Sequence, residues 1–229
     1  MENIVLKISI MLVPGLFAIT LHEVAHGYLA EKFGDPTARL LGRLTLNPLK
    51  HLDPIGTLAL LLFGFGWAKP VPVNFGNLRH PQRDMIWVSL GGPLMNLTLA
   101  LASALLLRLL IHFGGFLPQQ GSLGGMVLEP LALMIGFSLY INVLLGLFNL
   151  VPLPPFDGGR VVIGLLPARA SKVMASLEPF GFIIVLLLIF YTDLWRLVFQ
   201  PLINQVVIFL AGPSLVIVQT AMDFLLSRS

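Results

Sequence analysis

Residues 8–33 have the sequence ISIMLVPGLFAITLHEVAHGYLAEKF, an apolar run that carries three ionisable side chains within five residues, His22, Glu23 and His26, and ends with Glu31 and Lys32. The run extends over residues 4–33, which exceeds the roughly 20 residues that a helix needs to cross a bilayer. Charged groups are costly inside a bilayer, so ionisable residues in a spanning helix indicate a functional site. The stretch therefore predicts a membrane helix with a site built on it.

The composition of the whole chain also indicates a membrane protein. Of 229 residues, 56% are hydrophobic and 11% are charged, whereas about a quarter of the residues of a soluble domain are charged. Too few polar side chains remain to cover a water-facing surface. The absence of cysteine excludes disulfides and cysteine-bound zinc. The net charge of +3 comes from basic residues spread over several loops, and this pattern argues against nucleic-acid binding.

We expect an all-α polytopic membrane protein with about five transmembrane helices, forming a single membrane-embedded domain over residues 1–229. The five apolar spans are 4–33, 85–107, 130–156 (with its helix ending near Leu150), 174–191 and 197–222. The domain then has four consecutive parts: the helix with the ionisable residues (1–33), a cytoplasmic or re-entrant loop (34–83), the second and third spans (84–172) and the C-terminal spans (173–229).

The loop between the first two spans has two unusual segments. Residues 55–67 are apolar but too few to span a bilayer comfortably, which favours a re-entrant or interfacial segment. In residues 68–74, β-branched residues alternate with prolines, which predicts a small edge strand or β-hairpin at the membrane surface.

The basic residues predict the orientation in the membrane. With the N-terminus outside, 11 of the 14 Lys and Arg residues lie on the cytoplasmic side, as the positive-inside bias favours. The opposite loop, 114–127, carries no charge. We therefore expect a multi-pass protein of the cell (inner, or cytoplasmic) membrane with its active site towards the cytoplasmic side.

His22, Glu23 and His26 have the spacing HExxH. On a helix, residues i and i+4 lie on one face, so both imidazoles can bind one ion. Glu23 lies beside that pair, where it can act as a general base.

A catalytic zinc needs a third protein ligand, and Asp157 fits best among the candidates Asp53, Glu129, Asp157 and Glu178. It follows the third span in NLVPLPPFDGGR (149–160), at the depth and on the side expected for the histidines. The three prolines of this stretch prevent a regular helix, while its two glycines permit a tight turn.

Both motifs resemble those of the site-2 proteases, peptidase family M50, in their compact prokaryotic form. Residues 17–26 match the pattern F-x-x-x-x-H-E-x-x-H, and residues 149–158 match N-x-x-P-x-P-x-x-D-G. The stretch 91–96, GGPLMN, is similar to a glycine-rich segment near the family's active site. No PDZ or CBS domain of the larger members is expected.

The resemblance implies one Zn²⁺ per chain, bound by His22, His26 and Asp157. It implies that Glu23 is the general base and that Asn149 holds the substrate backbone or the developing oxyanion. It further implies intramembrane proteolysis, in which peptide bonds in or near the transmembrane segments of single-span membrane proteins are hydrolysed. The partners expected are such substrates and the lipid bilayer.

Several alternatives remain open. A membrane zinc transporter also places His and Glu on membrane helices, although it should carry polar positions across the membrane. A membrane zinc protease acting on soluble or lipidated C-termini and a non-catalytic scaffold are two further possibilities. For Asn96, an interhelical hydrogen bond and a functional role are equally favoured. For His51, a surface position is favoured over a role as ligand or substrate contact.

Overall fold

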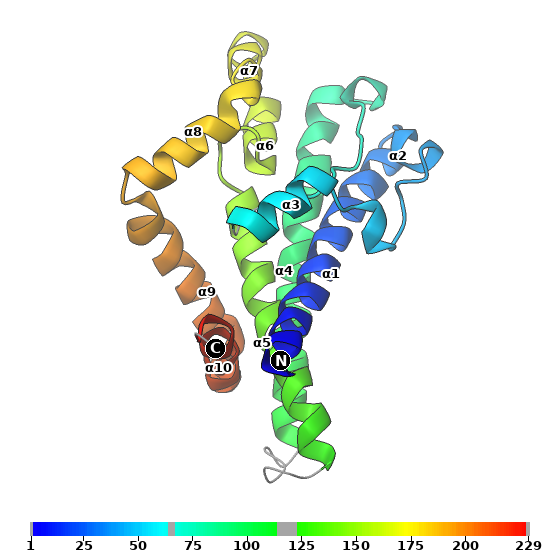
Figure 1. Cartoon of the computed structure of the whole chain (residues 1–229). Coiled ribbons are helices and arrows are strands. Elements are labelled where there is room, and N and C mark those ends of the chain that lie inside the picture. The colour runs from blue at the N-terminus through cyan, green and yellow to red at the C-terminus, as the bar shows by residue number, and fades with distance from the viewer. Residues whose placement is uncertain (1, 64–66, 114–122, 228–229) are drawn as a thin grey trace. The chain divides into compact units, whose positions relative to one another are not determined.

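The computed structural model describes residues 2–63, 67–113 and 123–227 (Figure 1). Its three longest helices are α1 (Glu2–Lys32), α4 (Pro81–Phe113) and α5 (Leu123–Asn149). The shorter helices are α2 (Thr37–Leu40), α3 (Pro54–Phe63), α6 (Asp157–Leu165), α7 (Ala168–Ala175), α8 (Glu178–Tyr191), α9 (Gln200–Ala211) and α10 (Leu215–Leu226). The described residues contain no strand beyond an isolated antiparallel bridge between Leu52 and Ala68. The all-α prediction is confirmed.

Within the described residues, four helical segments are long and apolar enough to cross a membrane. They are Ile4–Lys32, Pro81–Phe113, Val127–Asn149 and Trp195–Leu226, and they correspond to four of the five predicted spans. The chain is therefore a multi-pass membrane protein. The other predicted span, 174–191, contains α8, whose 14 residues extend about 21 Å and so fall short of the roughly 30 Å of hydrocarbon. The count of five spans stays a prediction.

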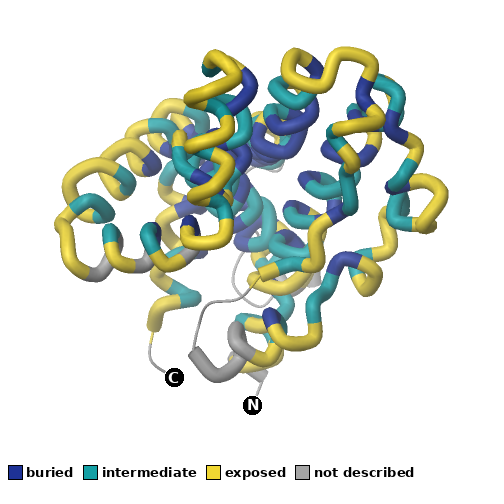
Figure 2. The backbone as a smooth tube through the Cα atoms, turned by 90° about the horizontal axis from the view of Figure 1, so that it is seen from above, coloured by how far each residue is buried: buried dark blue, intermediate teal, exposed yellow. Residues whose placement is uncertain are grey.

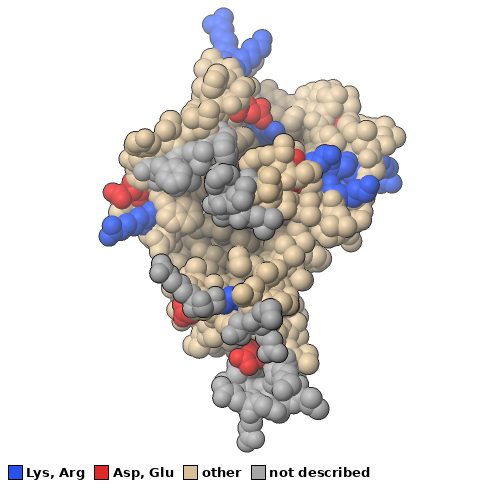
Figure 3. All heavy atoms as spheres, in the orientation of Figure 1, with Lys and Arg blue, Asp and Glu red and all other residues tan. Residues whose placement is uncertain are grey.

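The spanning helices expose many large apolar side chains, and several of their buried positions hold small residues. On α1, Val5, Val13 and Phe17 are exposed, while Ala18 and Ala30 are fully buried. Exposed and buried residues alternate along single helices (Figure 2), and few charged side chains interrupt the face drawn in Figure 3. Small residues at helix contacts and apolar side chains facing outward are expected where the surrounding solvent is lipid.

The helices form two compact units, each assembled from distant parts of the sequence. The first comprises Met1–Ala18, Asn96–Leu145 and Arg196–Ser229, with an apolar core of Ile10, Leu133, Phe137 and Ala221. The second comprises Ile19–Met95 and Gly146–Trp195, with Ala30, Leu78 and Val88 in its core. Since α1, α4 and α5 each contribute residues to both units, the prediction of a single domain stays a prediction.

A ladder of buried polar side chains joins three helices of the first unit. The Asn96 Nδ2 of α4 donates to the Asn142 Oδ1 of α5 at 2.9 Å and to the Ala18 carbonyl of α1 at 3.4 Å. Asn142 donates in turn to the Ser138 carbonyl at 2.9 Å, and Ser103 bonds the Ser138 hydroxyl at 2.9 Å. Of the two alternatives for Asn96, these contacts favour interhelical hydrogen bonding.

The last span bends where α9 meets α10. Gly212 has φ +53°, a backbone conformation that glycine adopts without steric cost, and a 3₁₀ turn over Gly212–Ser214 follows. The Arg108 Nη2 donates to the Leu210 carbonyl at 2.8 Å, which satisfies one of the acceptors exposed at the end of α9. The α10 helix then continues in a different direction from α9 (Figure 1), so the predicted span 197–222, which lies within the membrane-spanning segment Trp195–Leu226, is built from two helices.

The segment 34–83 differs from the predicted strand or hairpin. Helix α3 occupies most of the predicted re-entrant stretch 55–67, of which residues 64–66 lie outside the described residues. Residues 69–74 form no ladder with any described segment, so the hairpin is not confirmed. The physical reason is that Pro70 and Pro72 have no N–H, while the N–H groups of Val71 and Asn74 bond carboxylates instead of a partner strand.

The surface position favoured for His51 is wrong, because only 1% of this residue is exposed. Its Nε2 donates to the Thr45 carbonyl at 2.8 Å, and its own carbonyl accepts from the Lys69 N–H at 2.8 Å. His51 therefore closes the turn before α3 against the chain that follows α3.

The ladder in the first unit generates a stability prediction. Replacing Asn142 with Ala leaves the buried Asn96 amide without its side-chain acceptor, and in the membrane no water replaces that bond. We expect the free energy of unfolding in detergent micelles to fall by about 0.6–1.7 kcal/mol, the range measured for such bonds. Leu105→Ala, at an outward-facing position of α4, is the control and should change it little. An equal loss in both variants would show that the amide pair does not stabilise the unit.

Candidate metal centre

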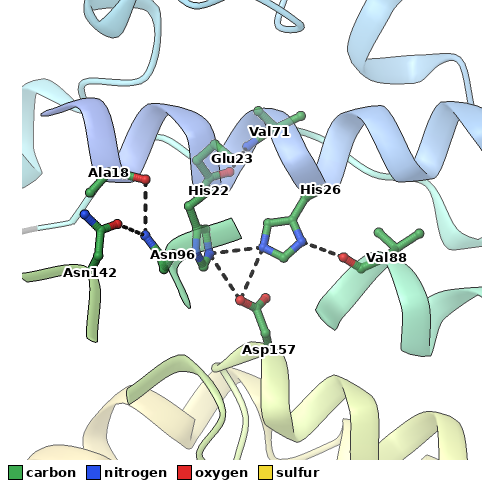
Figure 4. Close-up of polar contacts among 9 residues, drawn as sticks. All are labelled: Ala18, His22, Glu23, His26, Val71, Val88, Asn96, Asn142 and Asp157. Atoms are coloured by element: carbon green, nitrogen blue, oxygen red, sulfur yellow. Dashed lines mark hydrogen bonds and ion pairs between the residues drawn. The ribbon is translucent and has the colours of Figure 1, made fainter. Parts of the chain in front are cut away.

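Helix α1 presents two imidazoles on one face. His22 and His26 lie one turn apart, each is 8% exposed, and their ring centroids are 4.7 Å apart. Their Nε2 atoms approach to 3.1 Å, and both rings point away from the α1 axis towards Asp157 (Figure 4). The helical spacing of HExxH thus brings the two nitrogens to one point, as the sequence predicted.

Asp157, the first residue of α6, completes the cluster. Its Oδ2 lies 3.2 Å from the Nε2 of His22 and 3.2 Å from the Nε2 of His26. Two glycines set this position, because the first turn of α6 lies directly on the preceding loop. A Cβ on Gly158 would lie 2.3 Å from the Leu150 carbonyl oxygen, and one on Gly159 would lie 2.4 Å from the Pro154 nitrogen.

The spacing of these three atoms fits a tetrahedral zinc site. With bonds of about 2.0–2.1 Å, neighbouring ligand atoms of such a site lie about 3.3 Å apart, close to the 3.1 and 3.2 Å found here. The Asp157 Oδ2 is buried and accepts no hydrogen bond within the described residues, although both imidazole nitrogens lie near it. Two imidazole nitrogens and a carboxylate oxygen without a hydrogen bond, all close to one point, are a donor set for a divalent cation.

The surroundings of the cluster prepare the imidazoles for binding a metal. The Nδ1 of His26 donates to the Val88 carbonyl of α4 at 2.7 Å, a bond that leaves the Nε2 lone pair free for an ion (Figure 4). Gly92, one turn further along α4, leaves room for the nitrogens, because a Cβ there would lie 2.4 Å from the Nε2 of His26 and 2.5 Å from that of His22. Neither the Val88 carbonyl nor this role of Gly92 was predicted from the sequence.

Glu23 lies on α1 beside the histidines and is held by a backbone amide. Its Oε2 accepts the Val71 N–H at 2.7 Å (Figure 4). Within the described residues, no donor bonds the other oxygen, Oε1. One carboxylate oxygen is therefore anchored, and the second is left to accept a proton.

The structure distinguishes Asp157 from the other candidates for the third metal ligand. Asp53 accepts the Gly56 N–H at 2.7 Å, and Glu178 pairs with Arg160 at 2.8 Å. Glu129 is an exposed residue of α5. Asn149 is the last residue of α5 and begins the segment that leads to Asp157; its catalytic role stays a prediction.

Two histidines and a carboxylate around one buried point, with a glutamate on the same helical turn, define a zinc-dependent metalloprotease. Comparisons with known proteins agree. Residues 122–191 match the family model "Peptidase family M50". YwhC of Bacillus subtilis is 43% identical over 189 residues, which cover 82% of this chain and 83% of that protein. No solved structure matches the chain.

Two further relatives come from mycobacteria. Rip2 of Mycolicibacterium smegmatis is 31% identical over 199 residues, covering 84% of this chain and 71% of Rip2. Rip2 of Mycobacterium tuberculosis H37Rv is 29% identical over 188 residues, covering 79% and 67%. All three relatives carry the name "Putative zinc metalloprotease". The chain belongs to peptidase family M50, the site-2 protease family, and is a zinc metalloendopeptidase of the membrane.

The space at Gly92 leads to a prediction about metal binding. In Gly92→Ala, the new Cβ occupies the point where the two Nε2 atoms meet, so we expect zinc to fall from one per chain to well below one. Metal content of the purified protein, measured by plasma mass spectrometry, tests this. Gly15→Ala on α1 is the matched control, because no atom lies within 4 Å of its Cβ position. Full zinc content in Gly92→Ala would contradict the site.

Proposed function

We propose that this protein hydrolyses peptide bonds within or near the transmembrane segments of single-span membrane proteins, as in regulated intramembrane proteolysis. The observation that carries the proposal is the position of the metal ligands. His22 and His26 lie inside the membrane-spanning segment Ile4–Lys32, and this position supports a substrate that reaches them from the bilayer. Membership of family M50 sets aside the zinc-transporter alternative.

The chemistry is divided between the metal and the chain. His22, His26 and Asp157 would hold the zinc ion, which when bound would supply a Lewis acid for the scissile carbonyl and for a water molecule. Glu23 takes the proton from the attacking water through Oε1 and delivers it to the leaving amine, while the Val71 N–H fixes Oε2. Asn149 donates a hydrogen bond to the substrate backbone or the developing oxyanion.

The substrate must lose its helical hydrogen bonds before attack, since a helix hides its carbonyl groups. An extended segment beside the site can receive it as an added strand, and residues 71–74 are the candidate. Their donors are few, because Pro72 has no N–H and the N–H groups of Val71 and Asn74 bond Glu23 and Asp35. The Val73 N–H is then the donor that remains for the substrate, together with the carbonyl groups of the segment.

For the placement in the cell, we propose the cytoplasmic membrane, with the N-terminus outside and the metal centre towards the cytoplasmic side. The supporting observation is the distribution of Lys and Arg. The segment 34–83 and the residues around α7 carry most of the basic residues, which the positive-inside bias retains in the cytoplasm.

The proposed general base leads to a direct test. Glu23→Gln keeps the shape and the acceptor for the Val71 N–H but cannot take a proton, so we expect cleavage to fall by a factor of 10² or more. Cleavage of a single-span substrate in proteoliposomes measures the activity, and zinc content shows whether the site survives. Cleavage at the wild-type rate would rule out Glu23 as the base. If the wild-type protein cut only soluble peptides, the intramembrane substrate would be wrong.

The single free donor of the docking segment gives another prediction. Val73→Pro removes the Val73 N–H, and one hydrogen bond contributes about 0.5–1.5 kcal/mol, so we expect KM to rise roughly two- to tenfold. Val73→Ala keeps the N–H while removing most of the side chain, and it is the matched control. Equal KM values for the two variants would show that the substrate does not use this donor.

A further inference from the structure

The extended segment 69–77 is held against the region around α1 at three points. The Arg43 Nη2 donates to the carbonyls of Lys69, at 2.9 Å, and Pro70, at 3.3 Å. Glu23 then accepts the N–H of Val71, and Asp35 accepts the N–H of Asn74, both at 2.7 Å. Two carboxylates thus accept hydrogen bonds from two of the few backbone N–H groups of this segment.

The side chain of Val71 is also fixed in place. It is 7% exposed, and Gly27, the residue after the second zinc-ligand histidine, leaves the space that it occupies. A Cβ on Gly27 would lie 2.9 Å from the Val71 Cγ1 and 3.1 Å from the Ala38 Cβ. The position of Val71 is therefore set by contacts along the same helix that carries the histidines.

Asp35 is the strongest of these anchors. It is fully buried, and its carboxylate accepts hydrogen bonds from the Thr37 N–H, the Thr37 hydroxyl, the Asn74 N–H and the Asn77 amide. Burial raises the pKa of the Asp35 carboxyl, but the hydrogen bonds from Thr37, Asn77 and Asn74 outweigh it and hold the pKa below its ordinary value. The group is therefore ionised at neutral pH, and its hydrogen bonds are charge-assisted.

We propose that Asp35 is a positioning residue for Glu23, acting through the Asn74 N–H, the stiff chain 71–74 and the Val71 N–H. Pro72, which lies between Asn74 and Val71, has a fixed φ angle, so fewer backbone torsions are available to absorb a displacement of Asn74 before it reaches Val71. The Val71 N–H in turn selects the carboxylate oxygen that is anchored and leaves Oε1 for the proton. The proposal rests on the role of Glu23 as general base.

The matched variants are Asp35→Ala, Asp35→Asn and Arg39→Ala. Asp35→Ala removes the anchor, whereas Asp35→Asn keeps the shape and one acceptor oxygen. Arg39→Ala breaks an ion pair between Arg39 of α2 and Glu31 of α1, and no hydrogen bond of this pair to segment 69–77 is found in the described residues. Zinc content, thermal unfolding, kcat and KM are measured for each variant with the single-span substrate.

We expect kcat of Asp35→Ala to fall by on the order of 10- to 100-fold, the loss that a displacement of about 1 Å causes in a catalytic group. KM and zinc content should stay near the wild-type values, Asp35→Asn should restore part of kcat, and Arg39→Ala should match the wild type. An unchanged kcat in Asp35→Ala would overturn the proposal. A rise in KM alone would assign Asp35 to substrate docking instead.

A second measurement follows the contact itself and needs neither substrate nor metal. In apoprotein in micelles, the Val71 amide should exchange its hydrogen slowly, and Asp35→Asn should speed that exchange at least severalfold, as Glu23→Ala should. Exchange at Val71 that is insensitive to Asp35→Asn would overturn the proposal even if Asp35→Ala does not fold. If the wild-type protein fails to cleave while Val71 exchange responds as expected, the proposed function fails and the positioning contact stands.

Discussion

The structure depends on three ligand atoms that meet at one buried point. The Asp157 Oδ2 and the Nε2 atoms of His22 and His26 all lie within 3.2 Å of one another, and the oxygen accepts no hydrogen bond in the described part of the chain. A buried carboxylate that accepts no hydrogen bond is unfavourable, and so is close contact between its oxygen and the two imidazole nitrogens. A divalent cation bound to all three atoms removes both costs. The fold of the second unit is arranged around this requirement.

Most of that arrangement depends on glycines, which have no side chain. Gly92 lets α4 lie beside the imidazoles, and Gly158 and Gly159 let α6 start directly against the loop behind it. The backbone supplies the remaining contacts: the Val88 carbonyl orients His26, and the Val71 N–H orients Glu23. Backbone groups and glycines define the space, and the proposed chemistry is assigned to the side chains of His22, Glu23, His26, Asn149 and Asp157.

The sequence predicted those parts of the site that local geometry determines. The i, i+4 spacing of His22 and His26 and the Pro/Gly pattern before Asp157 predicted three residues that the structure brings together, and four of the five apolar spans predicted correspond to membrane-spanning segments in the described residues. Contacts between distant segments could not be predicted. His51 is buried where its carbonyl accepts the Lys69 N–H, and the predicted strand or hairpin is not confirmed in the described residues, where Glu23 and Asp35 accept the N–H groups of Val71 and Asn74. Nothing in the local pattern around residues 68–74 shows that carboxylates from another segment occupy those amides.

Leucines and valines face outward on the spanning helices, and alanines and glycines are among the residues at their inner positions. At the outer positions any apolar side chain of any size leaves the contact with lipid unchanged, so these positions are free to drift. At the inner ones a single added methyl group meets a neighbouring helix. Among relatives, the side-chain volume at the small inner positions should therefore indicate shared ancestry better than the identity of the bulky outward-facing residues.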